Sequence, residues 1–162
     1  MINFAFAVFF LIITPGPGVL SAAGVGAAYG WNAGLKYIFG LFLGTNMVGF
    51  AVITGISFWV VSNPLLRFFL LFLSTAYLLF LAFKVATADK KMSFVRPRSK
   101  PGVLAGFVLQ PINPKAYFVN TVLFSGFAMY PENFLLEVIV KFVILNVIWI
   151  PIHVFWLFLG LS

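Results

Sequence analysis

The sequence predicts an all-α polytopic membrane protein, and three observations carry that prediction. Hydrophobic residues make up 63% of the 162 residues and charged residues only 8%, whereas a soluble domain is about half apolar and a quarter charged. Long uncharged runs alternate with short segments that hold Pro, Asn or clustered Lys and Arg. At about 20 residues per spanning helix, a chain of this length has almost nothing left for a separate soluble domain.

Five hydrophobic segments are predicted to span the membrane within one domain, residues 1–162: residues 4–29, 38–61, 65–83, 102–129 and 134–160. The second segment is an uncharged run, and at about 1.5 Å rise per residue it exceeds the roughly 30 Å hydrocarbon layer. Pro64 suits the first turn of the third helix. A proline inside the fifth segment, Pro151, predicts a kink.

A basic loop, residues 84–101, separates the third and fourth segments. It carries six of the ten Lys and Arg residues: Lys84, Lys90, Lys91, Arg96, Arg98 and Lys100. Under the positive-inside rule this loop is cytoplasmic. Alternation then places the N-terminus outside, Lys36 inside and Glu132 outside. Membrane topology thus accounts for the formal net charge of +7, and nucleic acid is not an expected partner.

Two of the five segments contain a break in the middle. Thr14-Pro15-Gly16-Pro17-Gly18 interrupts the first, and Gln110-Pro111-Ile112-Asn113-Pro114-Lys115 interrupts the fourth. Proline prefers the first helical turn and Asn is a favoured N-cap, so half-helices are predicted to begin at Pro17 and Pro114, the second running to about Tyr130. In a membrane, broken helices are tolerated where they line a cavity or are buried against protein.

The two broken segments run in opposite directions in this topology, so their half-helix starts face each other near the membrane midplane. A helix N-terminus presents N–H groups and a partial positive charge that suit a carboxylate. Transporters built from inverted repeats hold substrate between broken helices in this way. Aligned on the breaks, the first repeat has three segments and the second only two. The expected fold is therefore an incomplete 3+3 inverted repeat that lacks a sixth helix.

Lys115 lies near the middle of the fourth segment, roughly 20 Å from either end along the helix. A lone cation at that depth costs on the order of 2.5–3.5 kcal/mol, and no Asp or Glu lies deep in a span to pair with it. We therefore expect Lys115 and the half-helix starts to receive a substrate carboxylate. The expected binding residues are Thr14, Gly16, Pro17, Gly18, Asn46, Gln110, Asn113, Pro114 and Lys115. The alternative is that Lys115 only anchors the chain near a membrane surface.

Other residues have simpler interpretations. Small residues recur at every fourth position and predict close helix packing: Gly18, Ala22, Gly26, Gly30, Gly34, and again Gly40 and Gly44. His153 is the one histidine and titrates near neutral pH, so it is a candidate for proton coupling, with a hydrogen-bonded helix residue as the alternative. Asn46 and Asn146 also suit inter-helix hydrogen bonds. Glu132 and Glu137 are interpreted as solvated loop charges.

Several chemistries are absent from the sequence. There is no cysteine, which excludes disulfides and thiol catalysis. The chain also lacks a carboxylate pair, a Ser-His-Asp set, an HExxH motif and a P-loop. Neither an enzyme nor a bound metal or cofactor is expected.

The chain resembles the LysE/RhtB family of amino-acid exporters from end to end. The resemblance rests on the Thr14–Gly18 stretch, the Gly-rich face after it, Ala76-Tyr77-Leu78, the basic loop, and the run from Gly106-Phe107 to Pro111-Ile112-Asn113-Pro114-Lys115-Ala116. It implies a bacterial inner-membrane exporter, usually of six helices, that exchanges amino acids or close derivatives for protons. The family motif positions carried over are Pro15, Gly16, Pro17, Gly18, Asn113, Pro114 and Lys115. Ser74-Thr75-Ala76 departs from the glycine that commonly precedes the Tyr-Leu pair, and the sixth helix is lacking.

The substrate expected from these features is a neutral amino acid, because no acidic residue lies deep in the spans to meet a cationic side chain. Protons and the lipid bilayer are the other expected partners, and the small-residue faces are compatible with a homo-oligomer. Two alternatives stay open: a non-transporting subunit or scaffold that assembles through these faces, and an inactive truncated exporter.

Overall fold

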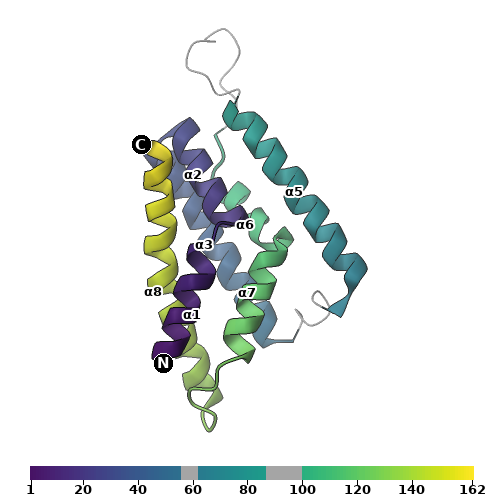
Figure 1. The fold of residues 1–162 in the computed structure, drawn as a ribbon, viewed down its shortest axis with the longest axis vertical. Coiled ribbons are helices and arrows are strands. Elements are labelled where there is room, and N and C mark those ends of the chain that lie inside the picture. Colours follow the sequence, from purple (N-terminus) through teal and green to yellow (C-terminus); the bar gives the residue numbers. More distant parts are fainter. Residues whose placement is uncertain (56–61, 87–99) are drawn as a thin grey trace.

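A computed structural model describes residues 1–55, 62–86 and 100–162, and within these ranges the chain is helical and contains no strand. This confirms the all-α class. The helices, drawn in Figure 1, are α1 (Ile2–Ile13), α2 (Pro17–Tyr29), α3 (Trp31–Ile53), α5 (Pro64–Ala86), α6 (Val103–Ile112), α7 (Pro114–Ser125) and α8 (Phe134–Leu161). The basic loop falls largely outside the described residues, apart from its two ends.

Among the described helices, α3 and α8 are each long and apolar enough to cross a membrane. Helices α1 and α2 meet at an angle of 52°, and as a pair they are long and apolar enough to form one more span with a break in its middle, or a re-entrant loop. The apolar parts of α5 and α6 are shorter. The described helices are therefore compatible with a helical membrane protein, and the count of five spans stays a prediction.

Some helix boundaries differ from the predicted ones. Helix α3 begins at Trp31, well before residue 38, because Gly30 adopts a φ of 80° that turns the chain directly from α2 into α3. Helix α7 ends at Ser125 and not near Tyr130, because the N–H groups of residues 129 and 130 bond to a side chain of α8. Helix α8 continues through Pro151 as one helix.

The closest helix contact joins α3 to α6 and depends on glycine. A Cβ at Gly40 would meet the carbonyl of Val103, and a Cβ at Gly106 would meet the carbonyl of Tyr37. The two backbones therefore touch, which confirms packing as the role of the small residue at Gly40. Helices α2 and α8 approach similarly, since a Cβ at Gly160 would meet the Ala23 carbonyl.

Helix α5 lies at the side of the bundle (Figure 1). The Tyr77 hydroxyl donates a hydrogen bond to the Ala105 carbonyl at 3.0 Å and lies 3.4 Å from the Tyr37 hydroxyl, so Tyr77 fastens α5 to α6 and α3. The described large apolar side chains that α5 exposes include Leu65, Phe68, Phe69, Leu71, Phe72, Leu79, Phe80 and Phe83. Such a face suits contact with lipid.

The two halves of the chain pack across each other. Helix α3 of the first half packs against α6 and α7, and α8 of the second half packs against α1 and α2. The turn after α7 reaches the N-terminus, where the Tyr130 hydroxyl lies 3.6 Å from the Met1 sulfur. The C-terminus lies at the opposite end of the bundle (Figure 1). This crossed packing brings the two helix breaks together.

Candidate functional site

The first break separates α1 from α2. The Thr14 hydroxyl donates back to the Phe10 carbonyl at 2.6 Å, and Gly16 is the extended N-cap of α2 with Pro17 at its first position. No side chain caps the start of α2. The first N–H groups of a helix have no intrahelical acceptor, so those of Gly18 and Val19 are available to a ligand or water.

The second break separates α6 from α7, and here the helix start is capped. The Asn113 Oδ1 accepts the Lys115 backbone N–H at 3.0 Å, as predicted for an Asn N-cap. The Asn113 Nδ2 donates to Gln110 Oε1 at 3.2 Å, and Gln110 Nε2 donates to Thr45 Oγ1 at 2.7 Å. A hydrogen-bonded series of three side chains therefore joins α3 to the start of α7.

A cavity of about 50 Å³ lies between the two breaks. It has room for roughly three to five waters at about 10–15 Å³ each. Its polar lining side chains are Thr14, Thr45, Gln110, Asn113, Lys115, Asn120, Trp149 and His153, and Gly16 and Gly18 also line it. The cavity therefore combines polar groups from both halves of the chain.

Lys115 links the two breaks directly. Its Nζ donates to the Thr14 carbonyl at 2.5 Å and lies 3.5 Å from the Pro15 carbonyl. A Cβ at Gly16 would lie only 2.7 Å from the Lys115 Cδ, so Gly16 leaves room for this side chain. Carbonyls at a helix C-terminus carry a partial negative charge, which makes the end of α1 the ammonium's partner.

His153 forms another wall of the cavity. Its ring is 2% exposed and stacks on Trp149 with centroids 3.5 Å apart. Its Nδ1 lies 3.0 Å from the Trp149 carbonyl. A neutral ring that donates from Nδ1 keeps Nε2 as an acceptor, and a Cβ at Gly18 would lie 3.3 Å from that atom. His153 is thus a hydrogen-bonded helix residue that also faces the cavity.

The structure brings together most of the predicted binding residues. Those lining the cavity are Thr14, Gly16, Gly18, Gln110, Asn113, Lys115 and His153, while Pro17 and Pro114 begin the adjacent half-helices. Asn46 does not line the cavity. Its amide pairs reciprocally with that of Asn146, at 3.1 and 2.9 Å, which confirms its other predicted role. The preceding residue, Thr45, faces the cavity in its place.

Sequence reasoning missed Thr45, Asn120 and Trp149. Asn120 is 2% exposed, and its Nδ2 donates to the Ala116 carbonyl at 2.8 Å. Its Oδ1 is buried and has no partner among the described residues. The signal that could have found it is an amide residue one to two turns after Lys115 on the same half-helix.

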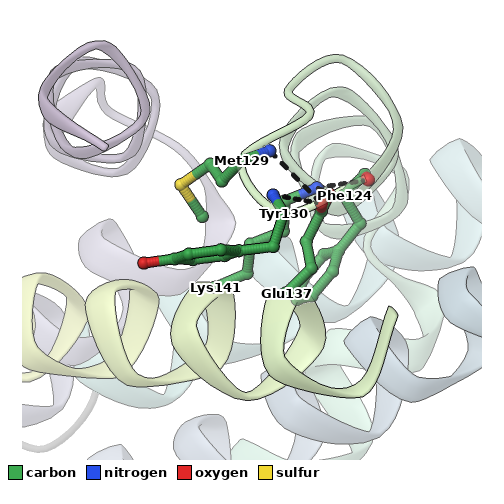
Figure 2. Close-up of polar contacts among 5 residues, drawn as sticks. All are labelled: Phe124, Met129, Tyr130, Glu137 and Lys141. Atoms are coloured by element: carbon green, nitrogen blue, oxygen red, sulfur yellow. Dashed lines mark hydrogen bonds and ion pairs between the residues drawn. The ribbon is translucent and has the colours of Figure 1, made fainter. Parts of the chain in front are cut away.

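A second polar cluster lies around α8, shown in Figure 2. Glu137 Oε2 accepts the N–H groups of Met129 at 3.2 Å and Tyr130 at 2.9 Å. Its Oε1 lies 2.6 Å from the Nζ of Lys141, which also donates to the Phe124 carbonyl at 2.8 Å. Lys141 is 1% exposed. The interpretation of Glu137 as a solvated loop charge is therefore wrong, because a buried cation requires a paired anion.

The fold and the central site define a multi-pass membrane protein built around two broken helices. Residues 9–160 match the family described as LysE type translocator, and the chain belongs to that family. This confirms the resemblance seen in the motifs. Since the family consists of translocators, the chain is not expected to be an enzyme, in agreement with the sequence analysis.

Relatives in the family include the "Cysteine/O-acetylserine efflux protein" of Salmonella typhi and of Salmonella paratyphi A. Each is 30% identical to the chain over 118 residues, which is 72% of this chain and 60% of the relative. The same protein of Salmonella typhimurium gives the same identity and coverage. The match thus spans three fifths of these relatives' length. No solved structure matches the chain significantly.

Proposed function

We propose that the protein exports small neutral amino acids or close derivatives across the bacterial inner membrane in exchange for protons. The observation that carries this proposal is the cavity where the two breaks meet, with Lys115 and the uncapped start of α2 on its wall. Both are positive, and none of the described residues that line that cavity is a carboxylate. A substrate carboxylate is the anion that fits there.

The position of Lys115 strengthens this assignment. It lies in the first turn of α7, where the helix dipole disfavours a cation. The carbonyls of Thr14 and Pro15 offset this only with partial charges. A bound carboxylate would replace these carbonyls as the hydrogen-bond acceptor of the Lys115 ammonium. It would also accept hydrogen bonds from the N–H groups of Gly18 and Val19. Thr14, Gln110 and Asn113 supply neutral hydrogen bonds beside it.

The crossed packing of the two halves supports an inverted repeat of three and two spans. In such transporters one half rocks against the other around a fixed midplane site. Met1 and Tyr130 share one end of the bundle, as the predicted topology with both of them outside requires. His153 is the proposed proton carrier, because its Nε2 faces the same cavity as Lys115.

The proposed substrate class is supported by the chemistry of the site and by the names of the relatives. Cysteine and O-acetylserine, named in the relatives' descriptions, each combine a carboxylate, an ammonium and a small uncharged side chain. The central cavity is small, and among the described residues of its lining the full positive charge is that of Lys115. Small neutral amino acids therefore suit it better than basic ones.

A scaffold function is less well supported, because the chain uses its small residues internally. Gly40 and Gly106 pack α3 against α6, and Gly26 and Gly34 both accommodate Leu157. Because these glycines pack helices within the chain, little of the predicted small-residue faces remains to contact other proteins. The exporter is therefore the preferred function.

The test is a growth screen in which cells are fed dipeptides, with the released amino acid measured in the medium. It uses the chain as given and a second form with a sixth helix added. We expect export of at least one small neutral amino acid, and at least about tenfold less with Lys115→Met, because a charge-assisted hydrogen bond contributes about 1.5–3 kcal/mol.

Lys36→Met is the matched control, because it removes the same charge from an exposed position on α3. It should export at the level of the unaltered chain. Full export by Lys115→Met would show that Lys115 only packs. If neither the chain as given nor the form with a sixth helix exports an amino acid, although both are equally abundant in the membrane, the exporter function is excluded.

A further inference from the structure

The amide oxygen of Asn120 is a buried acceptor that no described part of the chain uses. The residue is 2% exposed and lines the central cavity on α7. Its Oδ1 has no hydrogen-bond partner within the described ranges. Burying such a group without a partner costs about 1–3 kcal/mol, so a ligand that supplies a donor would gain from meeting it.

The orientation of this amide follows from its other end. Asn120 Nδ2 lies 2.8 Å from the Ala116 carbonyl, and a carbonyl can only accept. The nitrogen must therefore face Ala116, which leaves the oxygen on the other side. A Cβ at Gly49 of α3 would lie 3.2 Å from Oδ1, so the buried oxygen lies beside the bare backbone of α3 and a side chain at position 49 would crowd it.

The other amide oxygens of the cavity are already engaged. Gln110 Oε1 accepts from the Asn113 amide, and Asn113 Oδ1 accepts from a backbone N–H. The Thr45 hydroxyl accepts from Gln110. Among the described amide groups of the lining, Asn120 thus offers the free acceptor for a cationic donor.

We propose that Asn120 Oδ1 accepts a hydrogen bond from the α-ammonium of the substrate while Lys115 and the start of α2 hold its carboxylate. This rests on the proposed function and adds how the site distinguishes amino acids from other carboxylates. Asn120 follows Lys115 by five residues, about 7.5 Å along the helix axis. An α-amino acid with a hydrogen bond of about 2.9 Å at each end bridges a gap of this order.

The arrangement gives selectivity without a negative charge in the membrane. A buried acceptor that is left unpaired disfavours analogues in which the ammonium is missing. A 2-hydroxy acid also offers a donor, but that donor is uncharged and forms a hydrogen bond about half as strong. The site should therefore prefer an amino acid to its matched 2-hydroxy acid.

The test uses the purified chain in liposomes with three matched pairs: L-alanine and L-lactate, L-serine and L-glycerate, and L-cysteine and 3-mercaptolactate. We expect Asn120→Ala to reduce transport of the preferred amino acid at least about tenfold, and transport of its 2-hydroxy partner only about threefold, because the uncharged hydrogen bond is about half as strong. Asn120→Asp retains an acceptor at the same place, so it should keep the preference for the amino acid even if the alanine variant fails to fold.

Thr121→Val is the matched control, because the Thr121 hydroxyl is also buried without a partner but does not line the cavity. It should transport both members of each pair as the unaltered chain does. Equal loss for both members in Asn120→Ala, or loss of the preference in Asn120→Asp, would overturn the assignment while the exporter function stands. If the unaltered chain transports none of the three amino acids, the proposed function fails with it.

Discussion

Under the proposed function, Lys115 has two alternative partners, the carbonyls at the end of α1 and the carboxylate of the substrate. In the structure it bonds to the carbonyls at the end of α1, and a substrate carboxylate would offer a full charge in their place. The exchange requires only the flexible end of the side chain to move. In this proposal, Lys115 holds the two breaks together through these carbonyls and would release them when it pairs with the substrate.

The contact of Lys115 with Gly16 predicts an effect on transport. In Gly16→Ala the new Cβ would lie 2.7 Å from the Lys115 Cδ and 3.0 Å from Nζ, so the ammonium must leave its place. In the matched variant Gly18→Ala the closest atoms are at 3.3 and 3.5 Å. We expect export to fall at least about fivefold in Gly16→Ala, the equivalent of about 1 kcal/mol, and less in Gly18→Ala. Equal export rates for the two variants would contradict this account.

The Glu137–Lys141 pair predicts an effect on stability. Glu137→Gln keeps the shape of the side chain but leaves the buried Lys141 without a full negative charge, which is destabilising. We expect a lower melting temperature in detergent than for Glu132→Gln, whose glutamate is exposed. The double variant Glu137→Gln with Lys141→Met should recover part of the loss, because both charges are then absent. An unchanged melting temperature in the single variant would show that the pair adds no stability.

At the scale of the helices, the α3–α6 contact predicts strong sensitivity to a single methyl group. Gly40→Ala and Gly106→Ala each place a Cβ against a backbone carbonyl that cannot move aside. Overpacking of this kind costs about 1–3 kcal/mol or more. Gly102→Ala is the matched control, because no atom lies within 4 Å of its added Cβ. In thermal unfolding in detergent, Gly40→Ala and Gly106→Ala should melt at lower temperatures than Gly102→Ala. Equal melting temperatures would argue against close backbone contact between α3 and α6.

Local chemistry made the helix breaks predictable. Proline and an Asn N-cap affect the backbone of residues close to them in the sequence. The helix starts at Pro17 and Pro114 could therefore be inferred from the sequence alone. The end of α7 could not, because it depends on Glu137 from another helix.

The face that each helix turns to the cavity was harder to predict. In a membrane both the lipid side and the packed side of a helix are apolar, so hydrophobic periodicity does not identify the inner face. For that reason Asn46 was expected at the site when its neighbour Thr45 lies there, and Asn120 was overlooked. Neither position carries a local signal comparable to a proline break.

For the whole molecule, the topology can be tested directly because the chain contains no cysteine. Single variants Asn3→Cys, Glu132→Cys and Lys100→Cys can be labelled in intact cells with a maleimide that does not cross membranes. We expect the first two to react, because they belong to the proposed outer end, and Lys100→Cys to react only after the membrane is opened. The reverse pattern would invert the orientation of the bundle.

The crossed packing of the two halves also sets an order of assembly during synthesis. Helix α3 is complete at residue 53, but its main partner α6 begins only at residue 103. At about 5–20 residues per second the ribosome needs several seconds to supply that partner. During this interval the glycine-lined face of α3 has only lipid or the insertion machinery to cover it. The nascent first half must therefore survive in the membrane with only the contacts among α2, α3 and α5 to hold it, before its partners in the second half exist.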